Sequence, residues 1–134
     1  MTVEIDVAAA ESLGREFVAS IEYRDWERLA ACLRPDVEFR AVVPDHAEPV
    51  RDLVGPVDTC AQIARWFDGG EEYELIGSTV DLIGDRLHVG YRVTGTDQGV
   101  WYLVEQHAFA TLSGDRIGYL NLVCSGFRDI PPPD

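Results

Sequence analysis

The chain has 134 residues, and its 24 acidic side chains outnumber its 11 basic ones, which are all arginine, giving a formal net charge of −13. That length suits one domain over residues 1–134. Hydrophobic residues make up 46% of the chain, enough to form a full core. The negative charge argues against nucleic acid and against an anionic membrane surface as partners, because both would repel it.

The cysteines and the N-terminus bear on location in the cell. Cys32, Cys60 and Cys124 are odd in number and widely spaced, which gives neither a disulfide framework nor a zinc motif. The first residues are acidic where a signal peptide is basic, and no apolar run approaches the ~18 residues of a bilayer span. These features predict reduced thiols, a cytoplasmic protein, no membrane insertion and no metal site.

The first half of the chain has helical periodicity. Four apolar residues recur at every fourth position and predict a helix over about 8–23. They are Ala9, Leu13, Phe17 and Ile21. Asp25 can cap a second short helix, which Pro35 is expected to end.

A strand and a third helix are predicted next. Residues 37–41 alternate between apolar and charged side chains, as a strand does. Residues 44–56 contain three prolines and are expected to form a loop. Pro56 suits the first turn of a helix, and Gly69-Gly70 would end that helix.

The second half changes to the two-residue period of strands. Four strands are expected, with short turns between them, over residues 73–83, 86–94, 100–112 and 116–127. Short connections make neighbouring strands antiparallel. The fold class predicted is therefore α+β, with three helices packed on one face of a curled, mainly antiparallel sheet. Residues 129–134, rich in proline, are expected to be an extended tail.

Several phrases resemble one known superfamily. They are Arg24-Asp25-Trp26, Pro35-Asp36-Val37-Glu38-Phe39, Leu53-Val54-Gly55, and the hairpin from Val104-Glu105-Gln106-His107 through Gly114-Asp115-Arg116-Ile117 to Cys124-Ser125-Gly126-Phe127-Arg128. With the order of elements, they resemble SnoaL-like domains and ketosteroid isomerases of the nuclear transport factor 2-like superfamily. The resemblance covers nearly the whole chain and implies a cone-shaped, cystatin-like fold. It does not select one activity, because this fold hosts many.

The resemblance also gives expectations about catalytic positions. Ketosteroid isomerases use a tyrosine and two aspartates, and their pattern falls here on Phe17, on Ala41 or Arg40, and on His107. Two of the three groups are absent and the third is changed, so steroid isomerisation by that mechanism is disfavoured.

Glu105 and His107 are the candidate catalytic pair. They share a face of the 100–112 strand, about 7 Å apart, between Leu103 and Phe109. A neighbouring carboxylate can orient an imidazole and raise its basicity, as a general base requires. The alternative is a hydrogen-bonded pair with no substrate. Substrate-binding candidates are Arg40, as an anchor for a carbonyl, with Phe17, Trp66, Tyr91, Trp101 and Cys124.

The function expected is a SnoaL-like, cofactor-free enzyme using acid–base catalysis on a hydrophobic, oxygenated small molecule. Cyclisation, isomerisation and epoxide opening are the candidate reactions. The alternative is a non-catalytic module that binds a small molecule or dimerises as an accessory subunit. A cavity of roughly 300 Å³ or more with converging polar groups would favour an enzyme or a binder.

Self-association is expected through the back of the sheet. If the odd-numbered residues of the 100–112 strand face the helices, its largely apolar even-numbered residues would lie in water on a monomer. A patch of that kind usually marks a partner site. We therefore expect a two-fold homodimer that buries Tyr102, Val104 and Tyr119.

Overall fold

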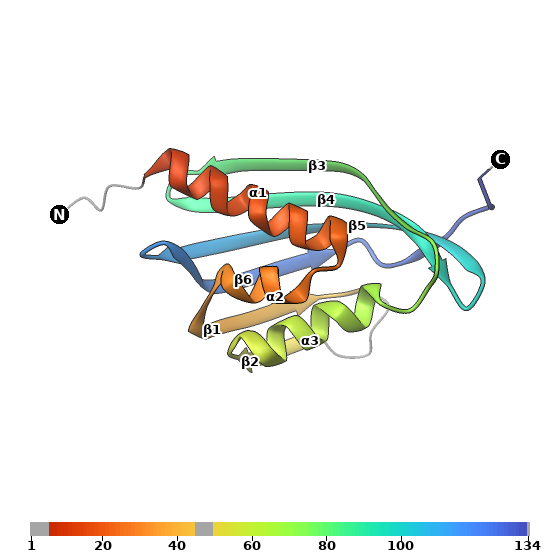
Figure 1. The fold of residues 1–134 in the computed structure, drawn as a ribbon, viewed down its shortest axis with the longest axis horizontal. Coiled ribbons are helices and arrows are strands. Elements are labelled where there is room, and N and C mark those ends of the chain that lie inside the picture. The colour runs from red at the N-terminus through yellow and green to blue at the C-terminus, as the bar shows by residue number, and fades with distance from the viewer. Residues whose placement is uncertain (1–5, 45–49, 134) are drawn as a thin grey trace.

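The computed structural model describes residues 6–44 and 50–133 (Figure 1). Its helices are α1 (Val7–Tyr23), α2 (Trp26–Ala31) and α3 (Pro56–Phe67). Its strands are β1 (Leu33–Val42), β2 (Val50–Val54), β3 (Tyr73–Ile83), β4 (Arg86–Asp97), β5 (Val100–Ser113), β6 (Arg116–Cys124) and β7 (Arg128–Asp129).

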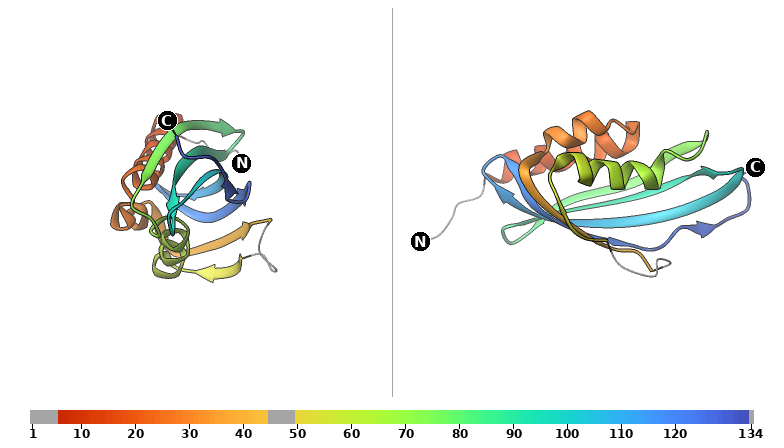
Figure 2. Two further views of the ribbon diagram at one scale, coloured as in Figure 1. Left: turned by 90° about the vertical axis from the view of Figure 1, so that its right-hand side faces the viewer. Right: turned by 90° about the horizontal axis from the view of Figure 1, so that it is seen from below.

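The strands form one mixed sheet. Its order is β2-β1-β6-β5-β4-β3, and the short β7 pairs with the start of β5. Only β1 and β6 run parallel among the described pairs. Figure 2 shows the sheet curled, with the helices over its concave side. The predicted α+β class with three helices and a curled, mainly antiparallel sheet is confirmed.

The helix ends follow local sequence signals. Asp6 accepts a hydrogen bond from the backbone N–H of Ala9 (3.1 Å), and Asp25 caps α2 by accepting one from Arg28 (3.1 Å). Gly55, at φ 94°, precedes Pro56, the first residue of α3. The three predicted helices are thus confirmed. None of the described helices is long and apolar enough to cross a membrane.

Several boundaries differ from the prediction, and two of the differences change an element in the first half of the chain. Pro35 does not end α2, which stops at Ala31, and it lies instead inside β1. The strand tolerates it because no residue between Leu33 and Glu38 pairs with β6, so no ladder hydrogen bond is lost. Residues 50–54 form β2 rather than loop, because they pair with β1 at the sheet edge.

The structure also shows which face of β5 meets the helices. The even-numbered residues from 102 to 110 are buried, and the odd-numbered residues from 101 to 109 are partly exposed on the outer face. Tyr91 of β4 lies opposite Gln106, and its ring contacts the rings of Phe17 and Phe67. Glu105 and His107 therefore lie on the side of the sheet away from the helices.

The expected dimer interface is corrected by this register. Tyr102 and Val104 are 6% and 1% exposed, because they pack inside the protein, and a second subunit cannot bury them. Tyr119 lies partly exposed on β6. Association through the outer face stays a prediction, now without Tyr102 and Val104.

The cysteines belong to the interior. Cys32, Cys60 and Cys124 are all buried, and no disulfide joins them. Burial raises the pKa of the Cys32 and Cys60 thiols to about 11, so both stay protonated at neutral pH.

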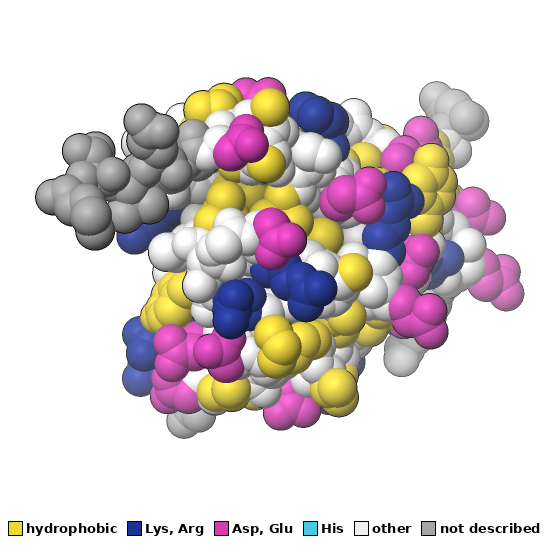
Figure 3. Space-filling model, turned by 60° about the vertical axis from the view of Figure 1, so that its left-hand side comes forward, with side chains coloured by type: hydrophobic (Ala, Val, Ile, Leu, Met, Phe, Trp, Pro, Cys, Tyr) yellow, Lys and Arg dark blue, Asp and Glu magenta, His cyan; other side chains and the backbone are white. Residues whose placement is uncertain are grey.

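Surface arginines offset part of the acidic charge. Figure 3 shows acidic and basic side chains intermixed on one face of the molecule. Arg28 binds both carboxylate oxygens of Glu16 at 2.7 and 2.8 Å, and this pairing lowers the pKa of Glu16. Arg40 lies 3.4 Å from Asp52. Such exposed pairs contribute little stability individually, but they occupy five of the eleven arginines.

Gly14 marks the close approach of α1 to β3. A Cβ atom at this position would lie 2.5 Å from Cγ1 of Val80. Replacing a glycine by alanine inside a helix ordinarily stabilises it by ~1 kcal/mol. Here we expect Gly14→Ala to lower the free energy of unfolding by ~1–3 kcal/mol, as overpacking does. Urea denaturation measures the change.

The matched control is the same substitution in a Val80→Ala background. Removing the valine methyl groups removes the shortest contact, while Cδ1 of Leu87 stays 3.2 Å from the new Cβ, so Gly14→Ala should then cost clearly less stability than in the unchanged chain. A gain in stability from Gly14→Ala in the otherwise unchanged chain would contradict this packing.

Candidate functional site

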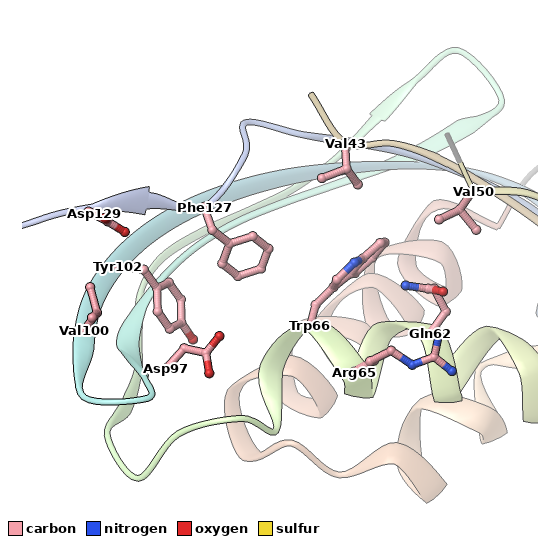
Figure 4. Close-up of a pocket in the computed structure, with 10 residues that line it drawn as sticks. All are labelled: Val43, Val50, Gln62, Arg65, Trp66, Asp97, Val100, Tyr102, Phe127 and Asp129. Atoms are coloured by element: carbon pink, nitrogen blue, oxygen red, sulfur yellow. The ribbon is translucent and has the colours of Figure 1, made fainter. Parts of the chain in front are cut away.

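A cavity of about 670 Å³ opens between α3 and the β4–β5 hairpin (Figure 4). This volume is typical of small-molecule sites. One wall is the last turns of α3, and the opposite wall is the hairpin with the segment that follows β6. The lining residues are Val43, Val50, Gln62, Arg65, Trp66, Asp97, Val100, Tyr102, Phe127 and Asp129.

The end of α3 is held in place by polar contacts. The guanidinium of Arg24 donates hydrogen bonds to the carbonyl oxygens of Phe67 (3.2 Å) and Gly70 (3.3 Å). The indole N–H of Trp26 donates to a carboxylate oxygen of Asp68 (2.9 Å). The turn between α1 and α2 thereby fixes the helical wall of the cavity.

The opposite wall is held by β7. Asp129 pairs with Tyr102 across the β5–β7 ladder, which turns the chain after β6 back over the start of β5. The rings of Phe127 and Tyr102 then lie 5.2 Å apart. Phe127 also lies 6.0 Å from Phe67, so aromatic rings connect this wall to α3.

Asp97 and Tyr102 form the polar end of the cavity. Figure 4 shows the Tyr102 hydroxyl beside the Asp97 carboxylate. Burial raises the pKa of Tyr102; the guanidinium of Arg24 acts against this shift, and the charge of Asp97 adds to it. The phenol is therefore protonated at neutral pH and can donate a hydrogen bond. A carboxylate and a phenol donor at one place can act as base and acid toward a bound oxygenated molecule.

Trp66 is the sequence-predicted site residue that lines this cavity. Its ring lies 6.3 Å from that of Phe39. The indole N–H is buried and has no hydrogen-bond partner among the described residues. An unsatisfied buried donor costs ~1–3 kcal/mol.

Three of the other predicted residues lie deeper, in the core. Phe17, Tyr91 and Cys124 are each at most 2% exposed. The hydroxyl of Tyr91 donates to Oε1 of Gln106 (2.7 Å), whose amide donates to the sulfur of Cys124 (3.5 Å). Burial raises the pKa of Tyr91 well above its ordinary value. Gln106 was missed, although it is the one amide in an otherwise apolar even-numbered row of the 100–112 strand.

The remaining predicted residues are on the outer face of the sheet. Arg40 is exposed and pairs with Asp52, and Trp101 is partly exposed on the odd-numbered face of β5. Neither lines the 670 Å³ cavity. His107 was expected to face inward, but the neighbouring Gln106 faces the helices instead.

Glu105 and His107 do form the predicted pair, as part of a longer chain across three strands. Nδ1 of His88 lies 2.8 Å from Asp81, and Nε2 of His88 lies 2.9 Å from Nδ1 of His107. Nε2 of His107 lies 3.0 Å from Glu105, which also accepts a hydrogen bond from Arg92 (3.0 Å). We call Asp81, His88, His107, Glu105 and Arg92 the outer relay.

Proton counting constrains the outer relay. Ionised Asp81 and Glu105 only accept, so the imidazole nitrogens facing them must donate. Each neutral imidazole ring carries one N–H proton, and in both rings that proton is donated to the facing carboxylate. The 2.9 Å contact between Nε2 of His88 and Nδ1 of His107 engages the remaining two ring nitrogens. All four ring nitrogens are engaged, and His107 could act as a base only after releasing a partner.

A shallow depression of about 320 Å³ lies beside the outer relay. Its floor includes Gly77 and Gly90, and Arg92, Glu105 and His107 line one side. A Cβ at Gly90 would lie 3.0 Å from Nδ1 of His107, so the glycine leaves room for the ring. Among the described residues no group of three or more His, Cys, Asp or Glu is placed to hold a metal ion.

Comparisons with solved structures bear on the fold. A proposed ketosteroid isomerase from Kribbella flavida is 19% identical (96% of this chain, 86% of that chain, TM-score 0.64). A proposed polyketide cyclase from Xanthomonas campestris is 20% identical (89% and 92%, TM-score 0.69). An LEH-like epoxide hydrolase from M. tuberculosis is 11% identical (90% and 86%, TM-score 0.63). This chain has the nuclear transport factor 2-like fold.

The resemblance seen in the sequence is thus confirmed as a shared fold. By sequence, no family model and no curated protein matches the chain. Because identities of 11–20% establish the fold alone, the activity must be argued from the side chains of the nuclear transport factor 2-like scaffold.

The outer relay makes a testable prediction about Glu105. The hydrogen bond from His107, with a further contribution from Arg92, lowers the pKa of Glu105 below that of an ordinary glutamate. His107→Ala should raise that pKa toward its ordinary value, measured by NMR titration of the side-chain carboxyl carbon. Because the pKa of Glu105 is lower in the folded than in the unfolded state, its ionisation stabilises the fold at pH values above the unfolded-state pKa. This contribution is lost as the pH falls through the folded-state pKa. Wild type should therefore lose more stability on acidification than the variant, by at most ~1 kcal/mol at this exposed site.

Arg86→Gln is the control, because Arg86 lies on the same strand as Arg92 and makes no contact with Glu105. An unchanged pKa of Glu105 in His107→Ala would contradict the hydrogen-bonded chain.

Proposed function

We propose that this protein is an acid–base enzyme of the SnoaL-like type that uses its own side chains on a hydrophobic, oxygenated small molecule bound in the 670 Å³ cavity. The observation that carries the proposal is the position of Asp97 and Tyr102 beside one another at one end of a cavity with aromatic walls. Tyr102 is buried whereas Asp97 is exposed to solvent, so apolar surroundings strengthen the electrostatic action of the Tyr102 hydroxyl on a bound substrate, and Asp97 stays ionised in contact with water.

The two groups have complementary roles. The Asp97 carboxylate takes a proton from a carbon next to a carbonyl group, and the electron pair of that C–H bond moves toward the carbonyl oxygen. The Tyr102 hydroxyl donates a hydrogen bond to the oxygen as it becomes negative. Where a C=C bond is attached to the deprotonated carbon, the resulting dienolate can take the proton back from Asp97 at the far carbon of that bond, which is isomerisation. Alternatively, the enolate carbon attacks a second carbonyl carbon of the same molecule, whose C=O π bond breaks and whose oxygen takes the proton held by Asp97, which is cyclisation.

Epoxide opening is compatible with the same pair. Asp97 would remove a proton from an attacking water molecule, and Tyr102 would donate a proton to the epoxide oxygen as its C–O bond breaks. Structural neighbours include proteins named as an isomerase, a cyclase and an epoxide hydrolase. They support the general class, and the cavity supports the choice of residues.

The outer relay is the second candidate site. Its support is the depression of about 320 Å³ beside His107 and Glu105, and the predicted catalytic role of this pair belongs there. A third reading, a binding or dimerising accessory module without chemistry, is supported only by the aromatic walls of the cavity and the partly exposed outer face.

Hydrogen exchange of a simple ketone tests the proposal. The probe is 2-tetralone in D₂O, whose α-hydrogens are replaced by deuterium whenever a base forms the enolate. We expect the protein to accelerate exchange, Asp97→Asn to reduce the acceleration by ~10²-fold or more, and Tyr102→Phe by ~10-fold. Proton NMR measures the loss of the α-signals.

Asp85→Asn is the matched control, because it removes the same charge at the β3–β4 turn, away from the cavity lining. Loss of exchange in His107→Ala but not in Asp97→Asn would move the chemistry to the outer relay. Binding of 2-tetralone without any acceleration would favour the accessory module.

A further inference from the structure

The cavity carries opposite charges at its two ends. Figure 4 shows Asp97 and Asp129 on the sheet side, and Gln62 and Arg65 on α3 across from them. Gln62 and Arg65 are three residues apart, so their side chains are neighbours on the same helix face. An amide and a guanidinium side by side present several N–H donors to one acceptor group.

Six of the eleven arginines of this acidic chain have partners, and Arg65 is one of the five that have none in the described part of the chain. Five described arginines pair with carboxylates, namely Arg15, Arg28, Arg34, Arg40 and Arg92. Arg24 is held by two carbonyl oxygens and by the ring of Tyr73. Arg65 has no hydrogen bond or ion pair among the described residues, although it lines the cavity. No described residue occupies its donors, which are therefore available to a ligand within the described part of the site.

The space between the charged ends is suited to a flat apolar body. Trp66 and Phe127 lie between them in Figure 4, with the buried indole N–H of Trp66 unsatisfied. The carboxylates of Asp97 and Asp129 would repel an anionic group, while Arg65 would attract one. A ligand with one anionic end is thus bound in one orientation.

We infer that the substrate or ligand of this cavity is an amphipathic carboxylic acid. Its carboxylate lies against Arg65 and Gln62, its apolar body lies between Trp66 and Phe127, and its opposite end faces the acid–base pair. The inference rests on the proposed function for the location of the site and adds the chemical class of the molecule. Because the chain has a net charge of −13, Arg65 is decisive for retaining an anion.

Two probes of the same shape test the charge requirement. They are 2-naphthylacetic acid, an anion at pH 7, and 2-naphthylacetamide, its neutral counterpart. Isothermal titration calorimetry should give a Kd about tenfold lower for the acid, as a charge-assisted hydrogen bond provides. In Arg65→Gln the acid should bind about tenfold more weakly and the amide unchanged.

Arg86→Gln removes the same charge at an exposed position of β4 that does not line the cavity, and it should leave both affinities as they are. Equal affinity of the two probes for the wild type would overturn the inference and leave the proposed function intact. A preference for the acid that survives in Arg65→Gln would also overturn it. Failure of both probes to bind would count against the cavity as a small-molecule site, and with it the proposed function.

Discussion

The side chain of Arg24 is the interaction on which the arrangement of the cavity depends. Its backbone is in the left-handed region at φ 51° and ends α1. Its guanidinium binds the carbonyl oxygens of Phe67 and Gly70 and lies 4.5 Å from the ring centre of Tyr73. The Tyr73 hydroxyl in turn donates to the carbonyl oxygen of Ile21 at 2.6 Å. One cation thus joins the end of α1, the end of α3 and the start of β3.

This clamp also explains why the cavity lies where it does. Helix α3 ends at Phe67, whereas β4 and β5 continue to a hairpin at residues 98–99. The inner face of the hairpin therefore has no helix above it. Tyr102, on that face, lies against Phe127 and the returning chain of β7. The cavity is the part of the concave face between the end of α3 and this hairpin.

Periodicity and turn chemistry were enough to predict most elements from the sequence, because these signals are local. The helix cap at Asp25 and the start of α3 at Pro56 are examples. Long-range packing was not predictable in the same way. Both faces of β5 are largely apolar, so only the contacts of Tyr91 with Phe17 and Phe67 show that the even-numbered face is the inner one. Because the even-numbered face is the inner one, His107 lies on the outer face of the sheet and not in the expected pocket.

The proposed acid–base pair of Asp97 and Tyr102 could not be predicted from the sequence, for a related reason. Strand β4 was expected to end at residue 94, which would have left Asp97 in a turn, whereas it continues to Asp97 and pairs with Val100. Asp97 and Tyr102 lie on opposite strands near the tip of one hairpin. Their side chains come close together because β4 continues as far as Asp97, and no motif in the sequence indicates this. The sheet then separates two kinds of polar group. On the outer face every imidazole nitrogen of His88 and His107 already has a partner, while in the cavity the donors of Trp66 and Arg65 have none among the described residues. Groups whose partners are supplied within the protein stabilise its fold, whereas the exposed guanidinium of Arg65, which has no partner among the described residues beside this cavity, is a group that a ligand can satisfy.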